Sequence, residues 1–136
     1  MTAKDYKYFE VARTVSYTSD FRRVKIGAVV VIKRHIVAVG ANSTKTHPIQ
    51  KKYNKFRFDI INNDTVHSLH AETQALLSVP HGIDLTEASI YTYRENAKGE
   101  LVKSRPCPSC IELIKDLGIR KIYYTTNEGY CEEIIV

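Results

Sequence analysis

The chain has 136 residues, of which 43% are hydrophobic and 26% are charged, and its formal net charge is +5. This length suits one hydrophobic core, so we expect a single domain over residues 1–136. No apolar run approaches the roughly eighteen residues of a membrane span, and the N-terminus lacks the apolar segment of a secretory signal. Because the cysteines number three, these features favour a cytoplasmic protein with no membrane partner, which uses thiols for a metal or for catalysis.

Positive charge is concentrated in the first half of the chain. Residues 1–68 hold thirteen Lys and Arg against five Asp and Glu, a net charge of +8, whereas residues 69–136 hold seven against ten, a net charge of −3. This asymmetry favours an anionic partner, such as a phosphate, a nucleotide or a nucleic acid. A solvated lysine-rich surface would have the same composition.

Hydrophobic patterning predicts an α/β protein. Residues 3–15 are expected to form an amphipathic helix with apolar residues three positions apart, and a two-strand hairpin is expected to turn at Lys33-Arg34. Because the strand runs are apolar throughout, we expect helices on both faces of a mixed sheet of four to five strands, a three-layer arrangement. The later elements are expected at His70–Leu77 (helix), Ala88–Tyr93 (strand), Cys110–Leu117 (helix), Lys121–Thr125 (strand) and Glu132–Val136 (short edge strand).

Residues 43–66 lack periodicity and are expected to form a long loop, a feature that is often functional. Within it, residues 45–58 interleave five Lys and Arg with Tyr53, Phe56 and Phe58. This composition is typical of a groove for single-stranded nucleic acid, in which aromatic rings stack on bases. The same residues could clamp one 5′-phosphate. Alternatively, the aromatic side chains anchor the loop on the core while the lysines are solvated.

Two short segments carry potential metal ligands. They are His70-Ala71-Glu72 and Pro106-Cys107-Pro108-Ser109-Cys110. Cys107 and Cys110 are three positions apart, which places both sulfurs on one side of a first helical turn, where a proline is tolerated. Two thiolates and one imidazole would leave a tetrahedral Zn²⁺ one open position, which is typical of a catalytic site.

These residues resemble the zinc-dependent cytidine/deoxycytidylate deaminase superfamily, whose signature is H-x-E followed by P-C-x-x-C. The resemblance covers about residues 20–125 and implies the three-layer fold of that superfamily. It implies that His70, Cys107 and Cys110 bind one Zn²⁺ per chain, since residues 43–66 add only His47. It also implies that Glu72 is the catalytic acid and base, taking a proton from water and returning protons to the base and the departing amine.

The resemblance also suggests substrate-binding residues. The backbone amide of Ala71 is expected to donate to the pyrimidine O2, and Asn42, which ends Gly40-Ala41-Asn42, is expected to contact the sugar. Arg105, together with Arg94 and Lys103, is a candidate for binding a phosphate. The expected reaction is hydrolysis of a cytosine base to uracil and ammonia, with a (deoxy)cytidine nucleotide such as dCMP as substrate.

Alternative functions remain compatible with the same residues. One is deamination of cytosine, or of adenine, in single-stranded DNA or RNA. A second is a zinc-stabilised module that binds nucleic acid without turnover, although a structural zinc would want a fourth ligand, for which Cys131 is the candidate. Relatives in this superfamily commonly associate, so a homo-oligomer is also a possible state.

Overall fold

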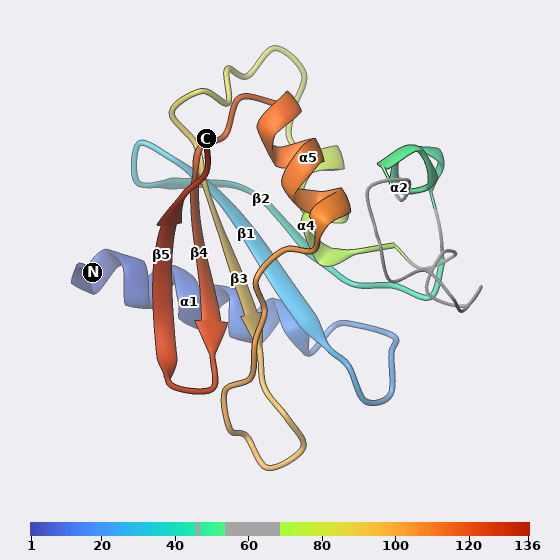
Figure 1. Cartoon of the computed structure of the whole chain (residues 1–136), viewed down its shortest axis with the longest axis vertical. Coiled ribbons are helices and arrows are strands. Elements are labelled where there is room, and N and C mark those ends of the chain that lie inside the picture. The colour runs from blue at the N-terminus through green and yellow to red at the C-terminus, as the bar shows by residue number, and fades with distance from the viewer. Residues whose placement is uncertain (46, 54–68) are drawn as a thin grey trace.

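The computed structural model describes residues 1–45, 47–53 and 69–136 (Figure 1). Its described strands form one mixed sheet in the order β2-β1-β3-β4-β5. β1 pairs antiparallel with β2 and β3, β3 pairs parallel with β4, and β4 pairs antiparallel with β5. The elements are α1 (Ala3–Ser16), β1 (Ile26–Ile32), β2 (His35–Ala41), α2 (Pro48–Tyr53), α4 (Ala71–Leu77), β3 (Ser89–Arg94), α5 (Pro108–Asp116), β4 (Lys121–Thr126) and β5 (Gly129–Ile134).

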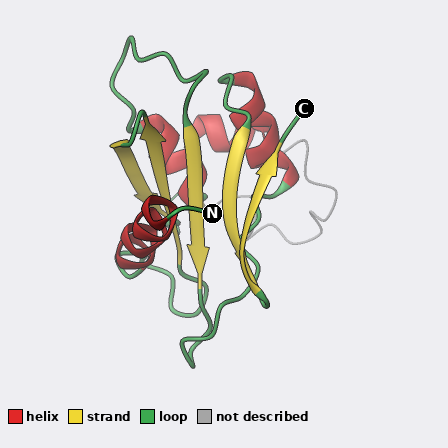
Figure 2. Cartoon of the chain, turned by 90° about the vertical axis from the view of Figure 1, so that its left-hand side faces the viewer, coloured by secondary structure: helices red, strands yellow, loops and turns green. Residues whose placement is uncertain are grey.

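Helices cover both faces of the sheet, which confirms the predicted three-layer α/β fold (Figures 1 and 2). Successive residues of β1 point to opposite faces, because side chains alternate along a strand. Val29 packs with α1 and Val30 packs with α4 and α5, so two hydrophobic clusters lie on either side of the sheet. The buried apolar run of β1 therefore has the two-sided burial that its sequence predicts.

Helix α1 begins with a capping box. The backbone N–H of Thr2 donates to Asp5 at 2.8 Å, and the Asp5 N–H donates to the Thr2 hydroxyl at 3.4 Å. The buried residues of the helix differ from the predicted stripe, because Tyr6 is 48% exposed. A constant spacing of three drifts around a helix of 3.6 residues per turn, so the buried face follows spacings of three and four. Its members are Asp5, Tyr8, Phe9, Ala12 and Ser16.

Two glycines allow the helices to approach the sheet closely. A Cβ atom added to Gly27 of β1 would lie 2.0 Å from the backbone oxygen of Ala12 in α1. A Cβ atom added to Gly40 of β2 would lie 2.4 Å from the backbone nitrogen of Ala75 in α4. In addition, the Ala41 N–H donates to the side-chain oxygen of Gln74 at 2.6 Å. These contacts fix α4 against β2, and the first turn of α4 carries Glu72 and directly follows His70.

Several boundaries differ from the predictions. The segment expected to be a loop over 43–66 contains the short helix α2, and residues 46 and 54–68, including Phe56 and Phe58, lie outside the described residues. The edge strand begins at Gly129 rather than Glu132, and it continues directly from β4 through a tight turn.

The hairpin turn lies at Lys33-Arg34, as predicted. These two residues have positive φ angles of 48° and 69°, as a two-residue primed turn requires. Among the described helices, none has the length and apolar character needed to cross a bilayer.

Candidate metal centre and active site

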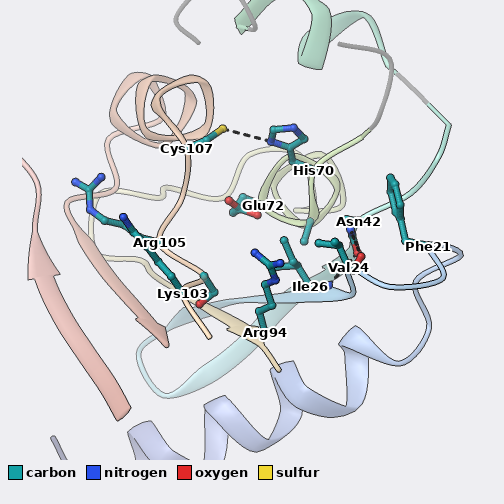
Figure 3. A pocket seen from close by; sticks show the side chains of 12 residues that line it. Phe21, Val24, Ile26, Asn42, His70, Glu72, Arg94, Lys103, Arg105 and Cys107 are labelled. Atoms are coloured by element: carbon teal, nitrogen blue, oxygen red, sulfur yellow. Dashed lines mark hydrogen bonds between the residues drawn. The ribbon is translucent and has the colours of Figure 1, made fainter. Parts of the chain in front are cut away.

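The structure brings together the three predicted metal ligands. The His70 Nδ1 atom lies 3.2 Å from the Cys110 sulfur and 3.4 Å from the Cys107 sulfur (Figure 3). All three donor atoms lie within 4.8 Å of one another. Each comes from the start of a helix: His70 and Cys107 are the residues that precede α4 and α5, and Cys110 is the third residue of α5.

The local sequence explains why two helices begin here. His70 and Cys107 both have extended backbone angles, which suits the residue before a helix. Pro108 follows at the first helical position, where its missing N–H has no intrahelical partner to lose. The positive ends of two helix dipoles therefore converge on the sulfurs, where they favour the thiolate form.

Hydrogen bonds adjust the acidity of the two thiols. The hydrogen bond from Cys110 to the Cys107 sulfur lowers the pKa of Cys107, to about 3, and the nearby His70 ring and Ser109 hydroxyl add to this effect. The same hydrogen bond and burial raise the pKa of Cys110. The Ser109 hydroxyl lies 3.0 Å from the Cys107 sulfur, and the Thr73 hydroxyl lies 3.9 Å from the Cys110 sulfur. Neither cysteine forms a disulfide.

This donor set fits a Zn²⁺ ion. Zinc prefers nitrogen and thiolate sulfur at about 2.0–2.3 Å, and two thiolates balance its charge. Three protein donors leave a fourth tetrahedral position. Within the described ranges, the structure forms no other cluster of three potential metal ligands. Cys131 lies in β5, where it pairs with Tyr124 of β4 rather than joining the cluster.

Glu72 is the second residue of α4 and lines the same pocket. Its side chain is buried, and the residue is only 5% exposed. Burial raises the pKa of this carboxyl, the charge of His70 opposes the shift, and the charge of Cys107 adds to it. A carboxyl with a raised pKa beside a metal centre is suited to taking up and releasing protons.

The pocket in front of Glu72 has a volume of about 380 Å³. Phe21, Val24 and Ile26 form apolar lining, and Ala71, the first residue of α4, also lines the pocket. First-turn amides have no partner within their own helix, so they can donate to a ligand. Neither Phe21 nor Val24 stood out in the sequence, because they lie in the irregular connection between α1 and β1.

Asn42 also lines the pocket, at the end of β2. Its side-chain oxygen accepts a hydrogen bond from the Ile26 N–H at 2.9 Å, and its side-chain nitrogen donates to the Val24 carbonyl at 2.7 Å. Asn42 therefore fixes the chain that enters β1. An amide has two acceptor lone pairs and two N–H groups, so one of each is left beyond these two bonds.

Three cations line the pocket, and within the described residues one of them has a counterion. Arg105 makes a bidentate ion pair with Glu133 of β5, at 2.9 and 2.8 Å, which lowers the pKa of Glu133 to about 2. The head groups of Arg94 and Lys103 make no hydrogen bond or ion pair with the part of the chain that the structure describes. Figure 3 shows the Arg94 head group directed into the pocket and the Arg105 head group directed away from it.

The chain that approaches Cys107 is held by buried hydroxyls. The Ser104 hydroxyl accepts from the Thr125 N–H at 2.8 Å and donates to the Thr92 carbonyl at 3.1 Å. Ser104 is therefore fixed across β3 and β4, and its two neighbours in the chain, Lys103 and Arg105, also line the pocket.

Helix α2 supports the metal centre, which the sequence did not predict. The side-chain oxygen of Gln50 accepts from the His70 N–H at 3.0 Å, and Gln50 is only 1% exposed. The Tyr53 hydroxyl donates to Asp116, the last residue of α5, at 2.6 Å. Tyr53 is buried and anchors this segment on the core. For Tyr53, this agrees with the alternative in which the aromatic side chains of the loop pack on the core.

Comparison with known families decides the identity of this site. The sequence profile described as the cytidine and deoxycytidylate deaminase zinc-binding region matches residues 2–126. The chain belongs to this family. The protein is therefore a zinc-dependent hydrolase that deaminates cyclic amidines, and the clustered His and Cys donors support one zinc per chain.

Solved structures share the fold of the deaminase. The dCMP deaminase from the cyanophage S-TIM5 has a TM-score of 0.63 and 24% identity, over 90% of this chain and 82% of that chain. The cytidine deaminase from Burkholderia pseudomallei has a TM-score of 0.66 and 18% identity, over 98% and 93% of the two chains. A diaminohydroxyphosphoribosylaminopyrimidine deaminase/reductase from Thermotoga maritima has a TM-score of 0.52 and 20% identity, over 88% of this chain and 28% of that chain. No curated protein matches the sequence at a significant level.

Proposed function

We propose that the deaminase acts on a cytosine nucleotide that carries a 5′-phosphate, with dCMP as the leading substrate. The observation that carries this proposal is the placement of the buried Glu72 carboxyl in one pocket with Arg94 and Lys103, whose head groups have no partner among the described residues. The fold of the chain resembles a cyanophage S-TIM5 dCMP deaminase that was solved in complex with dCMP and dUMP. That likeness supports a nucleotide substrate for this chain.

The reaction replaces the amine at C4 of the ring with the oxygen of water and releases ammonia. We assign His70, Cys107 and Cys110 as the ligands of the zinc, which when bound acts as a Lewis acid and lowers the pKa of water towards neutrality. Glu72 accepts the proton of the attacking water. It delivers that proton to the ring nitrogen, then takes the second proton of the former water from the new C4 hydroxyl and delivers it to the departing amine, so one carboxyl serves as base and acid in turn.

The pocket lining provides a reason for base selection. Phe21, Val24 and Ile26 offer an apolar surface to the faces of a planar ring. The first-turn amide of Ala71 is placed to donate to the pyrimidine O2, and the remaining hydrogen-bonding groups of Asn42 are available to a sugar hydroxyl. These assignments place the ring edge that bears the amine towards Glu72.

The phosphate is assigned to Arg94 and Lys103 rather than to Arg105. The Arg105 fork is filled by the Glu133 carboxylate, so a substrate phosphate would have to displace a bidentate ion pair. Arg94 and Lys103 have no such competitor among the described residues. A guanidinium that is not already paired can form charge-assisted hydrogen bonds with a phosphate, and these are stronger than hydrogen bonds between neutral groups.

A parallel ammonia-release assay tests the proposal. The substrates are cytidine, deoxycytidine, CMP, dCMP, dAMP and a short cytosine-rich single strand. We expect dCMP to have the highest kcat/KM. The variants Arg94→Ala and Lys103→Ala should each raise KM for dCMP about tenfold or more and leave KM for deoxycytidine nearly unchanged. Lys98→Ala, which removes an exposed lysine that does not line the pocket, is the matched control.

Three results would contradict the proposal. Equal kcat/KM for deoxycytidine and dCMP would show that the enzyme does not recognise the 5′-phosphate. Turnover of dAMP alone would replace cytosine with adenine as the target base. Turnover of the single strand without dCMP would assign the activity to nucleic acid.

A further inference from the structure

A second hollow adjoins the catalytic pocket and has not been given a role. Its volume is about 500 Å³, and it shares Val24 and Arg94 with the catalytic pocket. The register of the sheet explains this position, because Ile26 at the start of β1 pairs with Arg94 at the end of β3. The connection that precedes β1 and the connection that follows β3 therefore leave the sheet at the same end (Figure 1). The hollow lies between these two connections.

The hollow is strongly cationic. Arg22, Arg23 and Lys25 line it from the first connection, and Arg94 lies at the border with the catalytic pocket. The Lys25 ammonium donates to the Ser19 carbonyl at 2.8 Å. The three guanidinium head groups, in contrast, make no hydrogen bond or ion pair with any residue in the described ranges.

Glu95, the one acidic residue among the described residues that line the hollow, already has hydrogen-bond partners. Glu95 accepts hydrogen bonds from the hydroxyls of Tyr17 and Tyr93, at 2.6 and 2.8 Å, and its carboxylate lies 3.8 Å from the Arg13 Nε atom. These contacts hold Glu95 against α1. Among the described residues, the charge of Arg22, Arg23 and Arg94 therefore has no acidic partner.

A basic hollow at another place on the described chain differs in its charge balance. A hollow of about 610 Å³ near the N-terminus of α1 also has four basic residues in its lining, but three acidic residues lie among them and it is not part of the catalytic pocket. The basic residues are Lys4, Lys33, Arg34 and Lys121, and the acidic residues are Asp5, Glu87 and Glu132. A concave surface with unpaired guanidinium groups of one sign concentrates an anion.

We propose that this hollow binds a second phosphate of the substrate. The inference rests on the proposed function, because it takes the base to be at Glu72 and the first phosphate to be at Arg94 and Lys103. From there, the next phosphate along the ligand reaches Arg22 and Arg23, whose planar forks match phosphate oxygens. The second phosphate belongs either to a nucleoside diphosphate or triphosphate, or to the adjoining nucleotide of a short single strand.

The experiment compares substrates that differ in their second phosphate. The substrates are dCMP, dCDP, dCTP and a dinucleotide with a 5′-terminal phosphate and a deoxycytidine at its 3′ end. We expect the wild type to have a lower KM for dCDP and dCTP, or for the dinucleotide, than for dCMP. A lower KM for dCDP and dCTP would identify a nucleoside diphosphate or triphosphate as the source of the second phosphate, and a lower KM for the dinucleotide would identify a single strand.

The double variant Arg22→Ala/Arg23→Ala should raise KM about tenfold or more for the substrate with the lower KM. Its KM for dCMP should stay within about twofold of wild type. The control is Lys4→Ala/Lys7→Ala, which removes the same charge from exposed positions of α1 outside the hollow and should change no KM. This comparison separates local binding from a general loss of positive charge.

The proposal is overturned if the wild type gains nothing from any second phosphate, or if the double variant raises KM equally for all four substrates. In both cases dCMP is still deaminated, so the proposed function stands. Absence of dCMP turnover by the wild type would overturn the proposed function itself, and with it this inference.

Discussion

The contact between Gly40 and α4 should be sensitive to a single added methyl group. In Gly40→Ala the new Cβ would lie 2.4 Å from the Ala75 backbone nitrogen and 2.8 Å from the Ala71 carbonyl oxygen. Backbone atoms cannot rotate away as a side chain can, so the whole helix must retreat by about 1 Å to reach ordinary contact distance. The retreat moves the first turn of α4, which carries Glu72 and follows His70.

The expected loss of stability is about 2–3 kcal/mol, the upper part of the range for overpacked cores. For a chain of this size that corresponds to a fall in Tm of roughly 8–12 °C. Because catalytic groups must be held within about 0.5 Å, zinc content and ammonia release should fall as well. Thermal unfolding, metal analysis and a dCMP assay measure the three quantities on one preparation.

Gly27→Ala is the matched control. It adds the same methyl group to the neighbouring strand, where it would lie 2.0 Å from the Ala12 carbonyl oxygen of α1. This variant should also lose stability, but it should keep its zinc, because α1 carries no ligand. The reasoning is refuted if Gly40→Ala matches the wild type in Tm and zinc content, or if both variants lose zinc equally.

Three further predictions concern the charges of the site. Glu72→Gln should keep zinc and fold but lower turnover by about 10²–10⁴-fold, whereas turnover within tenfold of wild type would contradict its role as the proton carrier. Removal of zinc by a chelator should lower Tm, and added Zn²⁺ should restore both Tm and turnover, because a metal held only by the folded state stabilises it; an unchanged melting curve would argue against a metal at these donors. Because Arg105 holds the pKa of Glu133 near 2, below its ordinary 4.5, the unfolded chain binds a proton here before the folded one does. The stability advantage of wild type over Glu133→Gln should therefore be complete above about pH 4.5 and disappear as the pH falls towards 2, and an advantage that stays constant in urea unfolding across this range would count against the ion pair.

Part of the metal site could be predicted from local geometry. Cys107 and Cys110 share one helical turn, so their spacing places both sulfurs on one side. His70 comes from a different helix and was assigned with them through the resemblance to the deaminase superfamily. Strand β1 was predictable for a similar reason, since its long apolar run requires cover on both faces.

The remaining features depend on distant parts of the chain. Arg105 is neutralised by Glu133, which is 28 positions away and reaches it only because β5 pairs with β4. Helix α2 is six residues long, too short for a hydrophobic period to identify it. The buried face of α1 was misplaced because a repeat of three imitates, over a few residues, the true helical period.

Helix α2 contributes no metal ligand, but its position affects how the two ligand-bearing helices are placed. Gln50 is hydrogen-bonded to the backbone of His70, just before α4, and Tyr53 is hydrogen-bonded to Asp116 at the end of α5. The six-residue helix α2 therefore connects the two helices that present the metal donors. An insertion or a deletion between Gln50 and Tyr53 would change the distance between these two residues along α2 by about 1.5 Å per residue. Evolution can thus adjust how tightly the ion is retained through a segment that contributes no donor atom to it.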